Sequence, residues 1–168
     1  MKQTIAILFL GINILSCSNK TVPTMGNTNN KKTLTYLAIG DSYTIGEQVQ
    51  GKDSFPNQVY SLVKKDFSNF TEPRIIAKTG WTTDELERGI IAADKAEPLQ
   101  VSYDFVSLLI GVNNQYRGST VENYKPEFEE LLKKAIRFAG NNAAHVVVIS
   151  IPDWGVTPFA KGRNSNKI

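Results

Sequence analysis

Short apolar runs alternate with longer amphipathic segments from residue 34 onward. Short apolar runs bounded by polar or turn residues are typical of buried strands. We therefore predict four strands, at residues 34–39, 74–77, 105–110 and 145–151. Apolar residues at helical spacing predict helices over 54–67, from Thr83 onward and over 122–139. The predicted apolar stripes include Leu62 in the first, Ile91 in the second, and Leu131, Ala135 and Ala139 in the third. Strands separated by helices indicate an α/β fold with a parallel sheet and helices on both faces.

The first 33 residues follow a different pattern. Lys2 precedes an apolar run from Ile5 to Leu15, which has the length of a signal peptide and is too short to span a bilayer. The run ends in Ser16-Cys17, and a small residue before a Cys at this place resembles the bacterial lipoprotein box. We predict a lipoprotein signal peptide over 1–16 and lipidation at Cys17, in an exported protein anchored in a bacterial cell envelope. A plain secretory signal with an incidental Cys is the alternative.

Composition separates a tether from a domain. Residues 17–33 hold few large apolar side chains and predict a flexible tether, which leaves 34–168 for one domain. The chain has 19 Lys and Arg against 16 Asp and Glu, but four of the lysines and none of the acids lie in residues 1–33. The domain is therefore close to neutral, and we expect no nucleic-acid partner. One Cys and one His exclude a disulfide framework and the usual zinc clusters.

Glycine and polar residues follow three of the predicted strands. The three segments are Gly40-Asp41-Ser42-Tyr43, Lys78-Thr79-Gly80-Trp81-Thr82 and Gly111-Val112-Asn113-Asn114. In an open parallel sheet, sites form outside the carboxyl ends of the strands. In order and context, the segments resemble blocks I, II and III of the GDSL/SGNH hydrolase family, over about residues 34–160. The resemblance implies a three-layer αβα sandwich, the flavodoxin-like SGNH hydrolase fold.

The resemblance also implies a serine ester hydrolase that uses no metal or organic cofactor. Ser42 would be the nucleophile, and the oxyanion donors would be the backbone N–H groups of Ser42 and Gly80 and the side-chain amide of Asn113. Asp41 and Asn114 would support them, although the family commonly has Asp at the latter position. Substrates would be acyl or acetyl esters, including those of carbohydrates or lipids. Taken alone, each of these residues could instead be an ordinary cap, turn or loop residue.

The family takes its catalytic Asp and His from one Asp-x-x-His motif, which this chain does not contain. His145 begins the predicted fourth strand. The carboxyl end of that strand, where the candidate site residues gather, lies about six residues further on, about 20 Å away. A general base must come within about 3 Å of the proton it takes. We therefore predict that the catalytic Asp and His, and the last strand and helix of the fold, are absent from these residues. The chain should be inactive or nearly so, with an apolar, aggregation-prone sheet edge at the fourth strand.

Other interpretations stay open at this stage. Trp154 and Phe159 could line an acyl or sugar pocket, or could cover the sheet. The absence of a base would also fit a non-catalytic surface lipoprotein whose hydrolase-like domain binds a ligand. A flavodoxin-like nucleotide binder would fit the sheet, but neither phosphate-binding glycine loop is present. The nucleophile elbow of the α/β-hydrolases requires Gly two residues after the serine, where this chain has Thr44.

Overall fold

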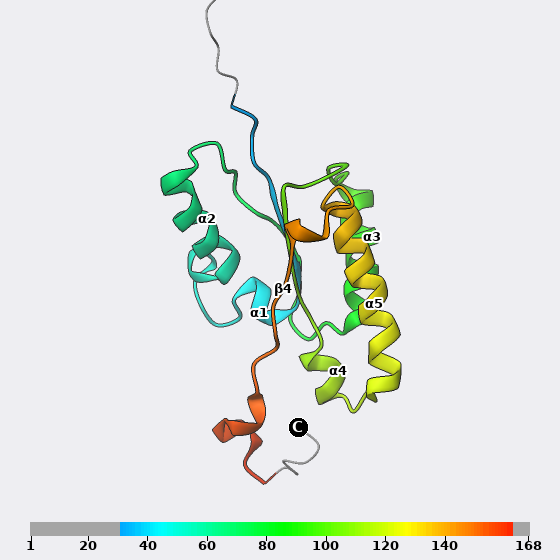
Figure 1. The fold of residues 1–168 in the computed structure, drawn as a ribbon. Helices are drawn as coiled ribbons and strands as arrows, with labels where there is room; N and C mark the ends of the chain where they lie inside the picture. The colour runs from blue at the N-terminus through cyan, green and yellow to red at the C-terminus, as the bar shows by residue number, and fades with distance from the viewer. Residues whose placement is uncertain (1–30, 163–168) are drawn as a thin grey trace, which may run out of the picture. The chain divides into compact units, whose positions relative to one another are not determined.

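The computed structural model describes residues 31–162, and Figure 1 shows their arrangement. The predicted signal peptide, Cys17 and most of the predicted tether lie outside the described residues. Four strands form one parallel sheet in the order β2-β1-β3-β4. The strands are β1 (Tyr36–Gly40), β2 (Arg74–Ala77), β3 (Phe105–Leu109) and β4 (Val146–Val148). The predicted parallel α/β fold is confirmed.

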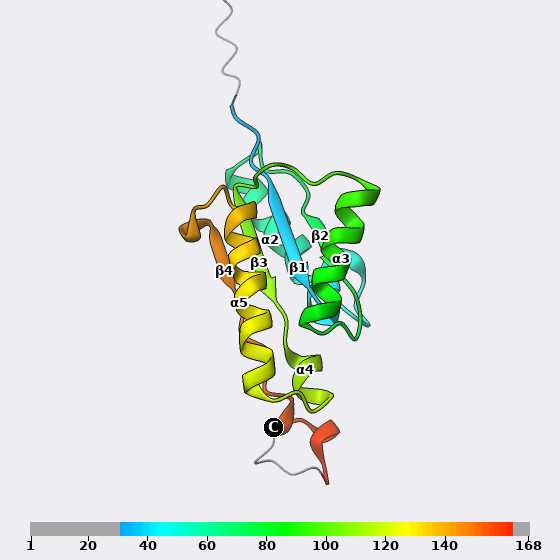
Figure 2. The same cartoon turned by 90° about the vertical axis from the view of Figure 1, so that its right-hand side faces the viewer.

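Helices cover both faces of the sheet. Helix α2 (Phe55–Asp66) packs on one face, and α3 (Thr83–Ala96) and α5 (Val121–Phe138) pack on the other, as Figures 1 and 2 show. Successive side chains of a strand point to opposite faces. Leu37 and Ile39 of β1 accordingly enter the core under α3 and α5, whereas Tyr36 and Ala38 enter the core under α2. Burial on both faces explains why β1 is almost wholly apolar.

The register of the sheet brings three strand ends together. Gly40, the last residue of β1, lies opposite Ala77 at the end of β2 and opposite Leu109 at the end of β3. The residues that follow these strands therefore meet at one edge of the sheet. Helices α1 (Ser42–Ile45) and α4 (Val112–Tyr116) begin at this edge.

Several predicted boundaries are wrong. The first strand begins at Tyr36, because Leu34 makes only an isolated bridge to Phe70. The fourth is limited to Val146–Val148, and His145 ends the preceding 3₁₀ helix η2 (Ala143–His145). Helices α1 and α4 were not predicted, since four or five residues are too few to show a helical period. The remaining 3₁₀ turns, also unpredicted, are η1 (Gly51–Asp53), η3 (Trp154–Val156) and η4 (Pro158–Ala160).

The predicted apolar stripes hold only in part. In α5, Leu131, Ala135 and Ala139 just beyond its end are buried as expected. By contrast, Leu62 of α2 and Ile91 of α3 are 60% and 57% exposed, so they do not belong to the core faces of their helices.

Strand β4 forms an edge of the sheet within the described residues. It pairs with β3 alone, and its Val147 and Val148 are 43% and 47% exposed. This is the apolar edge that the sequence predicts at the fourth strand. Within residues 31–162, no helix is long and apolar enough to cross a membrane.

Candidate active site

Ser42 lies at the turn between β1 and α1. Asp41 caps α1, and its Oδ1 accepts a hydrogen bond from the Tyr43 backbone N–H at 3.0 Å. The turn requires glycine at position 40, where a Cβ atom would lie 2.1 Å from Oγ1 of Thr44 and 2.3 Å from the carbonyl oxygen of Leu109. Because α1 can fold closely over the strand end, Ser42 is presented half-buried at the carboxyl edge of the sheet.

Asp41 is fully buried beneath this turn. Its Oδ2 atom has no hydrogen-bond partner among the described residues. Burial raises the pKa of the Asp41 carboxyl to about 6, and the hydrogen bond from Tyr43 N–H opposes the rise only partly. Asp41 thus supports the turn at Ser42 by capping α1. Its buried carboxyl is costly to ionise.

Gly80 lies in the loop between β2 and α3. Its φ of +82° is in the left-handed region, which glycine adopts without strain. The Gly80 carbonyl oxygen accepts a hydrogen bond from Nη2 of Arg117 at 2.6 Å. On its other side, the hydroxyl of Thr79 donates to the carboxylate of Glu47, which follows α1. The loop is therefore bonded to the segments that follow β1 and β3.

Asn113 extends from α4, at the end of β3. Its Nδ2 donates to the carbonyl oxygen of Trp81 at 2.9 Å. An amide nitrogen carries two N–H donors, so the second can serve a ligand. Asn113 and Ser42 line the same hollow, which places the predicted amide donor beside the predicted nucleophile.

Asn114 is buried beside these groups and ties α4 to the start of α3. Its Oδ1 accepts from the Thr83 backbone N–H at 3.1 Å, and its Nδ2 donates to the Thr83 hydroxyl at 2.7 Å. The Thr83 hydroxyl in turn donates to the carboxylate of Glu127 on α5. Asn114 therefore bonds the segment 111–114 to the start of α3 and, through the Thr83 hydroxyl, to Glu127 of α5.

A hollow of about 340 Å³ opens next to Ser42 and Asn113. Its other lining residues are mostly aromatic: Tyr43, Val112, Tyr116, Trp154 and Phe159. The ring of Tyr116 lies 5.8 Å from that of Trp154 and 5.9 Å from that of Phe159, centroid to centroid. Of the two predicted roles for Trp154 and Phe159, lining a pocket is the one that the structure supports.

A second hollow, of about 470 Å³, meets the first at Ser42 and Tyr43. Its lining includes the polar side chains of Glu47, Asp53 and Gln58. Ser42 thus stands between an aromatic hollow and a polar one.

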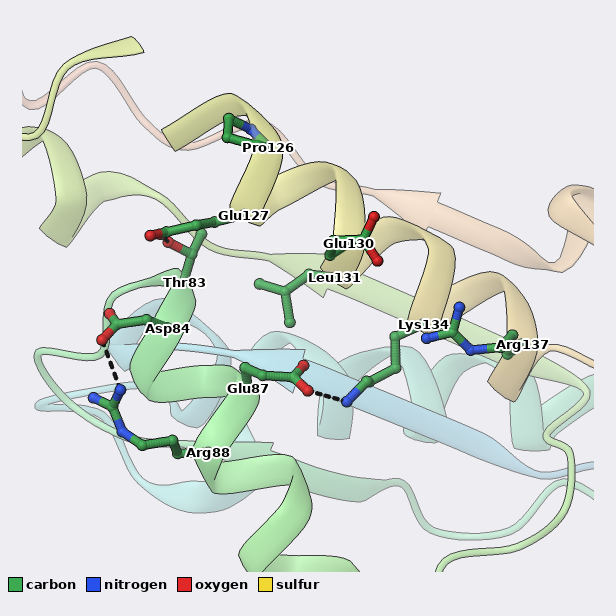
Figure 3. A pocket seen from close by; sticks show the side chains of 10 residues that line it. All are labelled: Thr83, Asp84, Glu87, Arg88, Pro126, Glu127, Glu130, Leu131, Lys134 and Arg137. Atoms are coloured by element: carbon green, nitrogen blue, oxygen red, sulfur yellow. Dashed lines mark hydrogen bonds and ion pairs between the residues drawn. The ribbon is translucent and has the colours of Figure 1, made fainter. Parts of the chain in front are cut away.

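A larger hollow, of about 600 Å³, lies between α3 and α5 and does not include Ser42 (Figure 3). Its charged side chains are partly paired with one another, for example Arg88 with Asp84 at 2.7 Å. None of the predicted site residues lines it, so the chemistry is better placed at the carboxyl edge. Within residues 31–162, no group of three or more His, Cys, Asp or Glu side chains could hold a metal ion.

His145 does not join the site. It precedes β4, which runs parallel to β1 through their common neighbour β3. His145 therefore lies at the amino end of its strand, whereas Ser42 follows the carboxyl end of β1. The chain's one histidine thus lies at the amino ends of the strands, whereas Ser42 lies at their carboxyl ends.

Sequence reasoning missed several residues that bond to this edge. Arg117 bonds to the β2–α3 loop, Thr83 bonds to α4, and Glu127 bonds to Thr83, each from a distant part of the chain. Tyr124 donates to the Ile110 carbonyl oxygen at 3.2 Å. The four-residue spacing of Asn113 and Arg117 was a usable signal, but it has meaning only where a helix is expected.

Ser42, Gly80 and Asn113 follow three neighbouring parallel strands, an arrangement that defines an α/β fold of the SGNH hydrolase class. The chain matches the GDSL-like Lipase/Acylhydrolase family over residues 38–167 and belongs to that family. The family assignment made from the three blocks is therefore confirmed.

Solved structures share the fold at low sequence identity. AlinE4, an SGNH-hydrolase family esterase, is 18% identical, with a TM-score of 0.53 over 71% of this chain and 58% of its own. EstA, a psychrotrophic esterase from Pseudoalteromonas sp., is 17% identical, with a TM-score of 0.54 over 73% and 63%. TesA is 17% identical, with a TM-score of 0.52 over 79% and 67%. The match thus spans 58% to 67% of the length of these proteins. A comparison with curated protein sequences found no match.

Proposed function

We propose that this chain carries the nucleophile and the oxyanion donors of a serine ester hydrolase acting on acyl or acetyl esters. The observation that carries the proposal is that Ser42 and Asn113 line one hollow, while Gly80 is bonded to the segment that follows Asn113. Membership of the GDSL-like Lipase/Acylhydrolase family supports ester hydrolysis as the reaction class.

In the proposed reaction, Oγ of Ser42 attacks the ester carbonyl carbon and its proton passes to a base. The carbonyl oxygen becomes an oxyanion, held by the N–H groups of Ser42 and Gly80 and by the Asn113 amide. Collapse of this intermediate expels the alcohol with a proton, and water then hydrolyses the acyl-serine to the carboxylic acid. Losing one oxyanion donor typically costs about 100- to 1000-fold in rate.

No imidazole of this chain is positioned to act as the base, because His145 lies at the amino ends of the strands. General acid–base catalysis contributes about 100- to 10,000-fold. We therefore propose that the 168-residue chain turns over esters slowly or not at all, and that external imidazole partly restores the reactivity of Ser42.

The two hollows beside Ser42 support esters of neutral carbohydrates or lipids as substrates. The aromatic hollow can hold an acyl group or a sugar ring, since aromatic side chains offer large apolar faces. The polar hollow contains Glu47 and Asp53, whose carboxylates can accept hydrogen bonds from hydroxyl groups and would repel an anionic alcohol.

The test compares wild type with Ser42→Ala. EstA has been described in a form inhibited by monoethylphosphonate, and a fluorophosphonate is a suitable probe here. We expect labelling of the wild type that imidazole accelerates and that Ser42→Ala abolishes, with little ester turnover in the absence of imidazole. Equal labelling of the two proteins would refute the proposed nucleophile. Fast turnover without imidazole would refute the proposal that this chain has no positioned general base.

The non-catalytic alternative gives a different result in the same experiment. A binding domain would remain unlabelled with imidazole present, yet would still bind acetylated glycans in a titration. Labelling that depends on Ser42 decides for the enzyme.

We also propose that Cys17 is lipidated and anchors the protein in a bacterial cell envelope. The supporting pattern is Lys2, the apolar run from Ile5 to Leu15, and Ser16 before the cysteine. Expressed in a bacterium, the wild type should sediment with membranes, whereas Cys17→Ala should not. Equal partition of the two proteins would favour a plain secretory signal.

A further inference from the structure

Asn113 of α4 and Arg117, the residue that caps the end of α4, are both bonded to the loop that carries Gly80. Asn113 donates to the carbonyl oxygen of Trp81 at 2.9 Å, and Arg117 donates to the carbonyl oxygen of Gly80 at 2.6 Å. The two donors are four residues apart, so they lie on the same side of the helical turn. Two successive carbonyl groups of the loop are thus held by the segment that supplies the proposed amide donor.

Arg117 also reaches past Gly80 to the first turn of α3. Its Nη1 lies 3.1 Å from Oε2 of Glu85. The same carboxylate oxygen accepts from the backbone N–H of Thr82 at 3.0 Å, while the Thr82 side chain accepts from the backbone N–H of Glu85, and the two bonds form a capping box. The hydrogen bond from Thr82 N–H is the largest cause that lowers the pKa of Glu85, followed by its contacts with the Thr82 hydroxyl and with Arg117. One guanidinium therefore joins Gly80 to the anchored start of a helix.

Gly80 needs such a restraint more than another residue would. It has no side chain, and its left-handed φ of +82° is one of several conformations open to glycine. Its N–H can stabilise an oxyanion only if it is fixed in direction before the reaction. The Thr79–Glu47 contact restrains the residue before it, and Arg117 restrains its own carbonyl group.

We infer that Arg117 is a positioning residue, which fixes the direction of the Gly80 N–H by holding the Gly80 carbonyl and Glu85 together. The inference rests on the proposed function, since it concerns a donor of the same site. Lysine cannot replace it fully, because one ammonium group lacks the planar fork that serves two acceptors at once.

The first test is independent of reactivity. Amide hydrogen exchange is measured at Trp81 and Thr82, whose N–H groups bond to the Lys78 carbonyl and to Glu85. Arg117→Ala should accelerate exchange at these amides about tenfold, the change expected when a hydrogen bond of about 1.4 kcal/mol is lost. Arg74→Ala is the matched control, because Arg74 at the amino end of β2 pairs with Glu97 and bonds to no loop carbonyl that is described.

The second test is the fluorophosphonate labelling rate at Ser42 in the presence of imidazole. Arg117→Ala should lower this rate about 10- to 100-fold, approaching the loss of one oxyanion donor. Arg117→Lys should fall between Arg117→Ala and the wild type, and added guanidinium ion should partly rescue Arg117→Ala. Arg74→Ala should react like the wild type.

The outcomes separate this inference from the proposed function. If the wild type labels at Ser42 and Arg117→Ala labels equally fast with unchanged exchange, the positioning role of Arg117 is refuted. If Arg117→Ala unfolds, an Arg117→Lys variant that is folded yet labels at the wild-type rate refutes it as well. If the wild type does not label at all, the proposed function fails, and the exchange experiment still decides whether Arg117 restrains the loop.

Discussion

The side-chain amide of Asn114 makes two hydrogen bonds to Thr83. It accepts from the Thr83 backbone N–H at 3.1 Å and donates to the Thr83 hydroxyl at 2.7 Å. A backbone N–H can only donate, so the amide oxygen must face it and the amide nitrogen must face the hydroxyl. The hydroxyl, having accepted, donates its own hydrogen to Glu127. The direction of donation from Asn114 to Glu127 is thus determined throughout.

Changing Asn114 to Asp, the residue common in the family at this position, should destabilise this chain. The new carboxylate cannot donate, so the single Thr83 hydrogen would be shared between two carboxylates. One buried acceptor would lose its partner, which costs about 1–3 kcal/mol. Urea unfolding of Asn114→Asp against wild type measures the loss. The double variant Asn114→Asp with Glu127→Gln should recover most of it, because the glutamine amide can donate to the hydroxyl. A double variant no more stable than the single one would contradict this network.

Replacing Asp41 with Asn should stabilise the protein at neutral pH. The folded-state pKa of about 6 exceeds the ordinary 3.8, so ionised Asp41 is disfavoured in the fold. This cost is fully present above pH 6 and decreases as the pH falls, until it disappears below pH 3.8, where both states are protonated. Asn keeps the acceptor for Tyr43 N–H without the charge, so the gain in unfolding free energy should approach about 3 kcal/mol at pH 8. Unfolding at pH 8 and pH 4 checks it, and an equal gain at both would show that ionisation is not the cause.

Gly40→Ala should prevent the turn that presents Ser42. The added methyl would lie 2.3 Å from the Leu109 carbonyl oxygen, a backbone atom that cannot move aside cheaply. We expect a loss of about 3 kcal/mol or more in unfolding free energy, at the upper end for overpacked sites. Gly51→Ala is the control, since a Cβ there meets no atom within 4 Å. Comparable stability of the two variants in thermal or urea unfolding would disprove the packing argument.

His145→Gln should leave the chemistry of Ser42 unchanged. The side chain lies at the amino end of β4, too far from the carboxyl edge to exchange a proton with the serine hydroxyl. The fluorophosphonate labelling rate of His145→Gln, with and without imidazole, should therefore equal that of the wild type. A marked drop without imidazole would mean that His145 does reach the site.

Val147→Lys should reduce aggregation. Val147 is 43% exposed on an edge strand, where a lysine blunts the pairing of sheets from different molecules. Light scattering and sedimentation at increasing concentration should show a larger soluble, monomeric fraction than in the wild type. Leu62→Lys tests the explanation, because Leu62 is 60% exposed on a helix and offers no strand edge. An equal improvement from both would point to general hydrophobicity.

Local patterns determined the architecture of this protein. Four apolar runs separated by helical segments predicted the parallel sheet, and β2 was predicted to the residue at 74–77. The positions of Ser42, Gly80 and Asn113 at one edge followed from the same pattern, because carboxyl ends of parallel strands meet there. The distant position of His145 from that edge also followed, since a strand has a known rise per residue.

The tertiary structure decided which side chains hold the site together. Arg117 meets the Gly80 carbonyl across 37 residues of chain, Glu127 meets Thr83 across 44, and Trp154 meets Gln115 across 39. No periodicity encodes such pairs, because each depends on the packing of two separate elements. The sequence alone therefore indicated where a nucleophile and its donors would gather. Only the packed chain showed that α4 bonds to the Gly80 loop, and that Asn114 and Glu127 both bond to the Thr83 hydroxyl.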